Sequence, residues 1–300
     1  MFRRSLTLTI AGIATLIAIA VAVLVPVPYV ILLPGPTLNT LGSDTSGQPL
    51  IKISGHQTYP ATGHLNMVTV GFNGGPGVRL NIFQALRGWL GPVNAVVPEA
   101  EIFPPGQTAQ QTHAQDVEQM ASSQQTATAA ALTELHIPYQ TLAVVVKTTP
   151  GYPASGVLKA GDAIEAVDGK PIIGVEIQQQ YKFPFTVTID VGNIGGPSAG
   201  MMFALGIIDM LTPDNLTGGK FIAGTGEITP AGQVEPIGGI QQKMAAARSA
   251  GATFFLTPSA NCANTAGAVP AGLHLVKVST LSQAVSDLEA IKAGKSVPSC

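Results

Sequence analysis

The sequence is poor in charge, aromatic residues and cysteine. Only 11% of its 300 residues are charged and its formal net charge is −2, so it offers no basic surface for nucleic acid. It has no G-x-x-x-x-G-K-[ST] motif, and Gly218-Gly-Lys-Phe221 lacks the required hydroxyl and spacing, so we expect no ATP binding. The five histidines are scattered and the two cysteines lack paired spacing. We therefore expect no metal site and no cofactor.

An uncharged apolar stretch follows Met1-Phe-Arg-Arg4 and extends from Ser5 to Val25, about the length that a bilayer requires. The two arginines before it favour a cytoplasmic N-terminus. We therefore expect residues 1–28 to be a cytoplasmic stub and a single-pass anchor in the cell membrane, with the remaining chain extracytoplasmic. The alternative is a signal peptide cleaved at Ala18-Ile-Ala20 or Ala20-Val-Ala22. Either alternative exports the domain.

The two cysteines, Cys262 and Cys300, could form a disulfide in an oxidising compartment. Such a bridge would contribute roughly 3–4 kcal/mol by restricting the unfolded chain. The alternative is two free thiols, and we predict the disulfide.

A glycine-rich turn at Gly195–Gly200 is the centre of the sequence. It follows an alternating β-branched stretch, Phe185–Val191, which predicts a strand, and it precedes an apolar stretch, Met201–Leu211, which predicts a buried helix. Ser198 lies where the turn becomes the helix. Amide groups at a helix start are unpaired and partly positive, so a hydroxyl there could attack a carbonyl whose developing oxyanion already has donors.

A serine nucleophile needs a base, and Lys243 is the candidate. A second glycine-rich stretch, Gly224–Gly239, leads into a predicted helix at Ile240–Arg248. The residues three and four positions from Lys243 on this helix carry no charge. Burial there could lower the lysine pKa from ~10.4 to about 7–8, which takes roughly 4 kcal/mol.

Four motifs in this region occur in the same order as in the proteolytic domain of Lon-type serine peptidases, which the sequence therefore resembles. They are Gly196-Pro-Ser-Ala-Gly200, Gly224-Thr-Gly-Glu-Ile228, Gly232-Gln-Val234 and Pro236-Ile-Gly-Gly-Ile-Gln-Gln-Lys243. The resemblance implies a Ser–Lys dyad, with Ser198 as nucleophile, Lys243 as general base and Thr225 as the threonine that hydrogen-bonds the lysine. The expected oxyanion donors are the backbone amides of Gly196, Ser198 and Ala199.

With the membrane anchor and the segment Pro153–Pro171, which resembles part of a bacterial PDZ domain, the chain resembles the YlbL-like, ATP-independent PDZ–Lon proteins of bacteria. The resemblance implies a serine endopeptidase of the cell envelope that cleaves protein or peptide substrates through an acyl-enzyme. Lon domains commonly form rings, so it also implies a homo-hexamer.

The alternation of helices and strands predicts an α/β (α+β) fold. Residues 29–138 are expected to form the first portion of the Lon-type domain, with an extended connection over Pro98–Gly106, and residues 178–300 to form its catalytic part. Between them, residues 139–177 contain Pro153–Pro171, which resembles a PDZ domain with a strand at Ala163–Val167 and a turn at Asp168-Gly169. About half of a PDZ module is absent, so this insert is either a peptide-binding edge or a structural arm.

Two other functions remain open. Gly196-Pro-Ser-Ala-Gly200 also satisfies the G-x-S-x-G pattern of α/β-hydrolases, and Asp209 or Asp214 with His274 would complete a Ser–His–Asp esterase site. The chain could also be a catalytically silent membrane scaffold or peptide-binding protein.

Two glutamates near the lysine motif could affect the pKa of Lys243. Glu227 fits the Lon pattern, whereas Glu235 would raise the pKa of Lys243 if it lay close by. We expect Glu235 to point into solvent from a hairpin.

Overall fold

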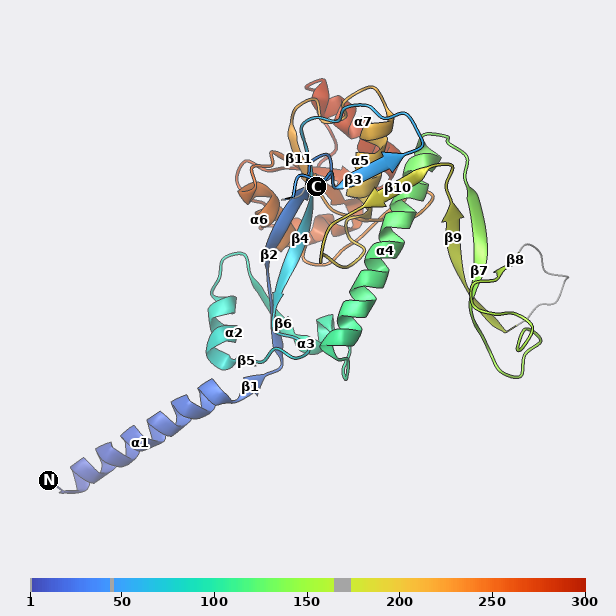
Figure 1. The fold of residues 1–300 in the computed structure, drawn as a ribbon. Coiled ribbons are helices and arrows are strands. Elements are labelled where there is room, and N and C mark those ends of the chain that lie inside the picture. Colours follow the sequence, from blue (N-terminus) through green and yellow to red (C-terminus); the bar gives the residue numbers. More distant parts are fainter. Residues whose placement is uncertain (1, 44–45, 165–173) are drawn as a thin grey trace.

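A six-stranded sheet forms the centre of the molecule in this computed structural model, which describes residues 2–43, 46–164 and 174–300 (Figure 1). The strands β15, β14, β11 and β4 are parallel, and β2 and β6 continue the sheet in antiparallel pairing. Residues before and after the predicted insert therefore share one sheet. In sheet order, the bounds are β15 (His274–Val278), β14 (Phe254–Pro258), β11 (Phe221–Gly224), β4 (His64–Asn73), β2 (Tyr29–Asn39) and β6 (Ala95–Pro98).

The sheet separates two hydrophobic cores, because successive residues of a strand point to opposite faces. On β14, Leu256 belongs to the larger core and its neighbour Phe255 to the smaller one. The helices α4 (Ala109–Glu134), α5 (Gly200–Leu211) and α7 (Leu281–Lys292) pack together on the side of the larger core. The helix α6 (Ile240–Ser249) supplies Met244 and Ala247 to the smaller core. The sheet thus places α5 and α6 on opposite faces.

The helix α5 lies at the centre of the larger core. Its residues are buried almost throughout, including Met202, Phe203 and Leu205. A helix that is apolar on all sides can be stable only when other elements surround it, and here α4, α7 and β4 do so. Two short antiparallel sheets complete this part, one of β3 (Ile51–Ser54) with β10 (Thr186–Ile189) and one of β12 (Glu227–Ile228) with β13 (Val234–Glu235).

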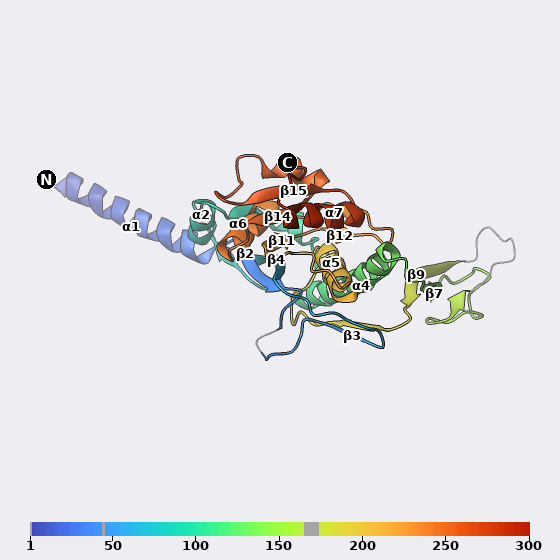
Figure 2. The ribbon, with the colours of Figure 1, turned by 90° about the horizontal axis from the view of Figure 1, so that it is seen from above.

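The N-terminal helix α1 (Phe2–Leu24) extends away from the rest of the molecule (Figures 1 and 2). Its segment Arg4–Leu24 is long and apolar enough to cross a membrane, and none of its described side chains is buried, as in a membrane anchor or a signal sequence. The strand β1 (Pro26–Val27) follows and pairs with β5 (Leu80–Asn81), which leads into α2 (Ile82–Trp89).

The expected extended connection over Pro98–Gly106 is wrong in part, because α3 (Glu99–Ile102) forms one helical turn there. Glu99 and Glu101 lie in its first turn, where carboxylates interact favourably with the unpaired amides of a helix start.

In the described residues, an antiparallel arm follows α4. The strands β7 (Gln140–Thr148) and β9 (Val175–Lys182) pair along their lengths, and β8 (Ala163–Ile164) adds to the edge of β7. Figure 1 shows this arm projecting from the body beside the end of α4. The described part of residues 139–177 contains no α-helix, so an inserted PDZ-like module is not confirmed. The expected turn at Asp168-Gly169 lies outside the described residues.

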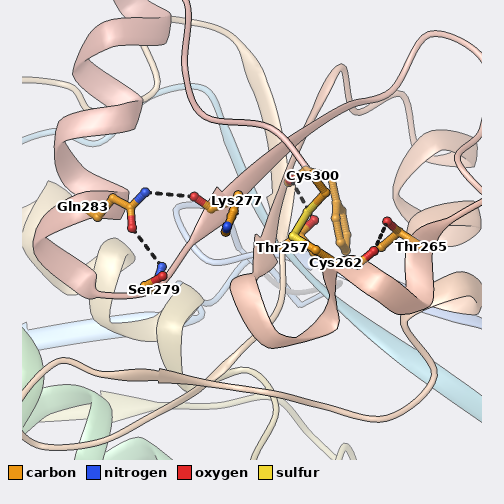
Figure 3. Close-up of a disulfide and its surroundings, with 8 residues drawn as sticks. Thr257, Cys262, Thr265, Lys277, Ser279, Gln283 and Cys300 are labelled. Atoms are coloured by element: carbon orange, nitrogen blue, oxygen red, sulfur yellow. Dashed lines mark hydrogen bonds between the residues drawn. A yellow bond between two sulfur atoms is a disulfide. The ribbon is translucent and has the colours of Figure 1, made fainter.

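The two cysteines form a disulfide that holds the last residues of the chain against the body. Cys262 lies in the 3-10 helix η1 (Ser259–Thr265), and its Cα lies 5.2 Å from that of Cys300. Figure 3 shows the bridge, with the Thr265 hydroxyl of the same 3-10 helix donating to the Cys262 carbonyl at 2.8 Å. The amide of Lys277 on β15 also donates to the carbonyl of Pro298, at 2.9 Å. The final segment is thus fixed at two points.

Candidate active site

Three separate elements bring Ser198, Thr225 and Lys243 together. Ser198 lies in the turn before α5, Thr225 directly follows β11, and Lys243 lies in the first turn of α6. Because β11 is a parallel strand between helices on opposite faces, the starts of α5 and α6 both approach its carboxyl end. In α/β sheets this edge is where ligands commonly bind.

The three side chains form a continuous hydrogen-bonded set. The Nζ of Lys243 lies 2.7 Å from the Oγ of Ser198 and 3.0 Å from the Oγ1 of Thr225. The Thr225 hydroxyl donates to the Ser198 carbonyl at 2.9 Å, and the Gly226 amide donates to the same carbonyl at 2.9 Å. The turn that carries Ser198 is thereby held from the β11 side, with its hydroxyl beside the lysine amine.

Burial of Lys243 sets the proton affinity of its amine. Its side chain is only 3% exposed, and Thr225 is fully buried. Desolvation lowers the pKa of Lys243 from 10.5 to about 7, against a smaller opposing effect of the Glu227 charge. A large fraction of Lys243 is therefore neutral near pH 7, which is the form that can accept a proton from a hydroxyl.

Two glycines with positive φ make this approach possible. Gly239, at φ +66°, precedes α6, and a Cβ there would lie 2.6 Å from a methyl group of Val70 on β4. Gly196, at φ +87°, lies in the turn before Ser198. Side chains other than glycine rarely adopt this backbone region, so both turns depend on glycine.

The long helix α4 supports the serine turn from outside the sequence motifs. The Ser123 hydroxyl donates to the Pro197 carbonyl at 2.9 Å, and the Asp116 carbonyl accepts the Gly196 amide at 3.1 Å. Ser123 and Asp116 could not be identified from the sequence, because nothing in their local sequence distinguishes them from other polar residues of α4.

The contact with Asp116 corrects one expected oxyanion donor. The Gly196 amide already donates to that carbonyl, so in this structure it does not face a substrate oxygen. Among the residues that the structure describes, the amides of Ser198 and Ala199 have no hydrogen-bond acceptor. These two remain available as donors.

The two glutamates on the β12–β13 hairpin differ in their relation to the lysine. Glu235 is exposed and pairs across the hairpin with Glu227. Glu227 is half-buried, and burial is the main cause that raises the pKa of its carboxyl. The Glu235 charge also raises this pKa, whereas the Lys243 charge lowers it. Glu227 is thus the acidic neighbour whose charge acts on Lys243, and Glu235 points into solvent as expected.

A cleft of about 520 Å³ opens in front of Ser198 and Lys243. The strand β4 continues beyond the end of its pairing with β11, and this continuation forms one wall. The lining is mainly apolar, with Asp116 and Glu227 as its acidic members, and this suits an extended chain with apolar side chains. Its principal apolar residues are Leu32, Met67, Val68, Val70, Phe72 and Ile237.

The residues proposed for an esterase triad lie elsewhere. Asp209 is buried on α5 and accepts the Leu216 amide at 2.6 Å, and Asp214 lies in the loop after that helix. His274 on β15 packs against the ring of Phe254, with ring centroids 5.6 Å apart. None of the three lines the cleft in the described part of the chain. The geometry therefore favours Lys243 as the partner of Ser198.

A buried lysine beside a serine, at a helix start and at the mouth of an apolar cleft, is the kind of arrangement that a serine peptidase site requires. The comparison with protein families identifies the particular domain. Residues 183–289 match the Lon protease (S16) C-terminal proteolytic domain, so this part of the chain is a Lon-type proteolytic domain.

Individual relatives are similar over limited stretches. The Lon protease of Syntrophomonas wolfei is 32% identical over 135 residues, which cover 42% of this chain and 16% of that protein. The Lon protease of Roseiflexus castenholzii is 47% identical over 66 residues, covering 22% of this chain and 8% of that protein. The Lon protease of Clostridioides difficile is 48% identical over 63 residues, which cover 21% of this chain and 8% of that protein. The chain thus spans less than a fifth of the length of these relatives.

Proposed function

We propose that this protein is a membrane-anchored, ATP-independent serine endopeptidase that cleaves protein or peptide substrates outside the cytoplasm. The observation that carries the proposal is the 2.7 Å contact between the Ser198 hydroxyl and the amine of Lys243, whose pKa is lowered to about 7 by burial. A buried amine with this proton affinity is suited to general-base catalysis near neutral pH.

In the proposed mechanism, neutral Lys243 takes the proton of the Ser198 hydroxyl as its oxygen attacks the scissile carbonyl. The amides of Ser198 and Ala199 stabilise the resulting oxyanion. The ammonium of Lys243 then gives its proton to the leaving amine, which leaves an acyl-enzyme on Ser198. Lys243 next removes a proton from water, and the hydroxide formed attacks the acyl carbonyl. As the bond to Ser198 breaks, the Lys243 ammonium returns the proton to the Ser198 oxygen, and the acyl group leaves as a carboxylic acid. Thr225 orients the lysine throughout.

Three observations support the proposed location. The apolar segment Arg4–Leu24 suits a membrane span, and the two arginines at positions 3 and 4 favour a cytoplasmic N-terminus. The disulfide between Cys262 and Cys300 is of a kind that persists in oxidising compartments. A cleaved signal sequence at α1 would give the same compartment without the anchor, and gel mobility of the protein from membranes, compared with the full chain, distinguishes the two.

The test uses the purified full chain in detergent, an unfolded protein as substrate, and no ATP. We expect cleavage by the native protein and none by Ser198→Ala. Ser155→Ala is the matched control, because Ser155 is an exposed serine on the arm, and it should cleave normally. A phosphonate probe should label Ser198 only in proteins that retain that residue. Equal cleavage by native and Ser198→Ala proteins would overturn the proposal, and no cleavage or labelling by either would favour a silent scaffold.

The assembly of the chain is part of the same proposal. Lon-type domains are expected to form rings, and the particle mass of the detergent-solubilised protein tests whether six copies associate.

A further inference from the structure

The helix α2 arranges its side chains in a way that is unfavourable in water. Its buried positions are the small residues Ala85 and Gly88, and a Cβ at Gly88 would lie 2.8 Å from the side chain of Ile31 on β2. Its large apolar side chains point outward instead. Trp89 is 70% exposed and Leu90 is 73% exposed. The outward apolar face consists of Ile82, Phe83, Leu86, Trp89 and Leu90.

This apolar face continues beyond the helix on both sides. Val78 precedes it and Val93 follows it, and both residues are exposed, at 55% and 41%. A soluble protein rarely exposes so many neighbouring large apolar residues without a partner for them. We call the seven exposed large apolar residues of this region, from Val78 to Val93, the α2 patch.

The α2 patch lies at the end of the proposed membrane span. The C-terminal end of α1 contacts both α2 and β5, and Figures 1 and 2 show α2 beside that end from two directions. The span Arg4–Leu24 has 21 residues, which in a helix cover roughly 30 Å, about the thickness of the hydrocarbon core. If the span crosses the bilayer, its end at Leu24 and the adjacent α2 lie at the level of the lipid headgroups.

We propose that α2 is a second membrane contact, a short amphipathic helix that lies in the interface of the outer leaflet and inserts the α2 patch among the lipids. The composition fits such a site. Tryptophan is favoured at the membrane–water interface, and Trp89 is the only tryptophan in the sequence. Arg79 and Arg87 are exposed at the two ends of the helix, where their guanidinium groups can reach lipid phosphates.

The contact would orient the protein on the membrane. One flexible link after Leu24 would allow the domain to rotate, whereas a span and a neighbouring interfacial helix together define a fixed orientation. Phe72 and Ile102, which line the cleft, belong to β4 and α3. Both elements lie on the side of the body nearer to α1 in Figure 1. The cleft would then be held close to the outer membrane surface. This inference depends on the proposed membrane location and not on the peptidase activity.

The unique tryptophan provides the test. The full chain is reconstituted in nanodiscs of phosphatidylcholine and phosphatidylglycerol, either unmodified or brominated on the acyl chains close to the headgroups. Bromine quenches a tryptophan only on contact. We expect brominated lipid to remove most of the Trp89 emission, and aqueous acrylamide to have little effect on it.

Two matched variants separate failure of this inference from failure of the anchor. Ile13→Trp with Trp89→Phe moves the tryptophan into the middle of α1, and Val269→Trp with Trp89→Phe moves it to an exposed loop outside both elements. We expect quenching by brominated lipid at position 13 and none at position 269.

Quenching at position 13 without quenching at Trp89 would overturn the α2 contact while the anchor stands. Strong quenching of Trp89 by acrylamide would also overturn the α2 contact. So would protection of Trp89 from both quenchers because a second copy of the chain covers it. Absence of quenching at both positions would overturn the anchor and the α2 contact together.

Discussion

The domain around Ser198 and the arm formed by β7, β8 and β9 bury their residues to very different extents. In the domain, α5 is buried almost throughout and even the polar Thr225 and Lys243 are enclosed. In the arm, most of β9 is exposed, and its middle is a row of glutamines, Gln178–Gln180. The match to the Lon-type domain begins at residue 183, directly after β9 ends at Lys182.

This difference indicates that the two regions contribute differently to the protein. Burial lowers the pKa of Lys243 and makes each hydrogen bond around Ser198 costly to lose, so chemistry and stability are concentrated in the domain. The arm is held at its base by the rings of Tyr139, Tyr181 and Phe183, whose centroids lie 5.6–5.9 Å apart. Substitutions should therefore have large effects in the domain and small effects in the arm beyond this base.

The largest expected effect is that of Lys243→Met. It removes the base but keeps an apolar side chain of similar length, so kcat/KM should fall by ~10²–10⁴-fold. Lys220→Met is the control, because Lys220 is exposed, and it should retain activity.

The same substitution should change the pH dependence of stability. The pKa of Lys243 is lowered on folding, so the unfolded chain binds more protons between pH 7 and 10.5, and stability rises with pH over this window. Lys243→Met should flatten that rise in melting temperature. A variant that melts far below the native protein would have lost activity through unfolding, which would count against the assigned role.

Thr225→Val should have the next largest effect. The substitution keeps the shape but leaves the Lys243 amine with one hydrogen bond fewer in a buried site, which costs about 1–3 kcal/mol. We expect kcat/KM to fall roughly 10–100-fold, with Lys243 still present to act as base. Thr253→Val, at an exposed threonine, should leave kcat/KM unchanged. Equal activity of both variants would show that Thr225 does not orient the lysine.

Glu227→Gln should shift the pH profile rather than abolish activity. The Glu227 charge raises the pKa of Lys243, so its removal lowers that pKa, and the rise of kcat/KM with pH should move to lower pH. The native profile should rise with an apparent pKa of about 7. Glu235→Gln tests the assignment, because Glu235 acts on Glu227 and not on the lysine. An equal shift in both variants would contradict a direct effect of Glu227.

The smallest effect should follow removal of the outer arm. Leu142 and Gln180 are cross-strand partners, and a two-residue Asn-Gly turn between them would replace residues 143–179 and leave the aromatic base intact. We expect cleavage of an unfolded peptide and the melting temperature to stay close to native, with kcat/KM within about twofold. Loss of folding or of peptide cleavage would show that the arm is part of the catalytic domain. A loss restricted to folded protein substrates would assign it a role in substrate capture.

The sequence predicted the central site better than its surroundings. The closeness of Ser198, Thr225 and Lys243 could be predicted, because each of them lies in a short glycine-rich motif. The strand and helices around them also follow from local apolar periodicity, as in the buried α5.

The support from α4 could not be predicted in this way. Ser123 contacts the Pro197 carbonyl across 74 residues of sequence, and such contacts depend on how complete elements pack. The occupied amide of Gly196 has the same origin, since its acceptor is the Asp116 carbonyl on that helix. The arm could not be predicted for another reason. Polar residues predominate in β9, so no alternation of apolar and polar residues marks it as a strand.

The hydrogen bonds among Ser198, Thr225 and Lys243 join three separate elements of one chain. For the proposed peptidase, this arrangement predicts that the reacting groups are aligned before substrate binds, so product should accumulate without a lag from the moment of mixing. Access to the cleft would then determine which proteins are cleaved, because only a chain that enters the cleft in extended form reaches the Ser198 hydroxyl. Folded proteins would not enter the cleft and would not be cleaved.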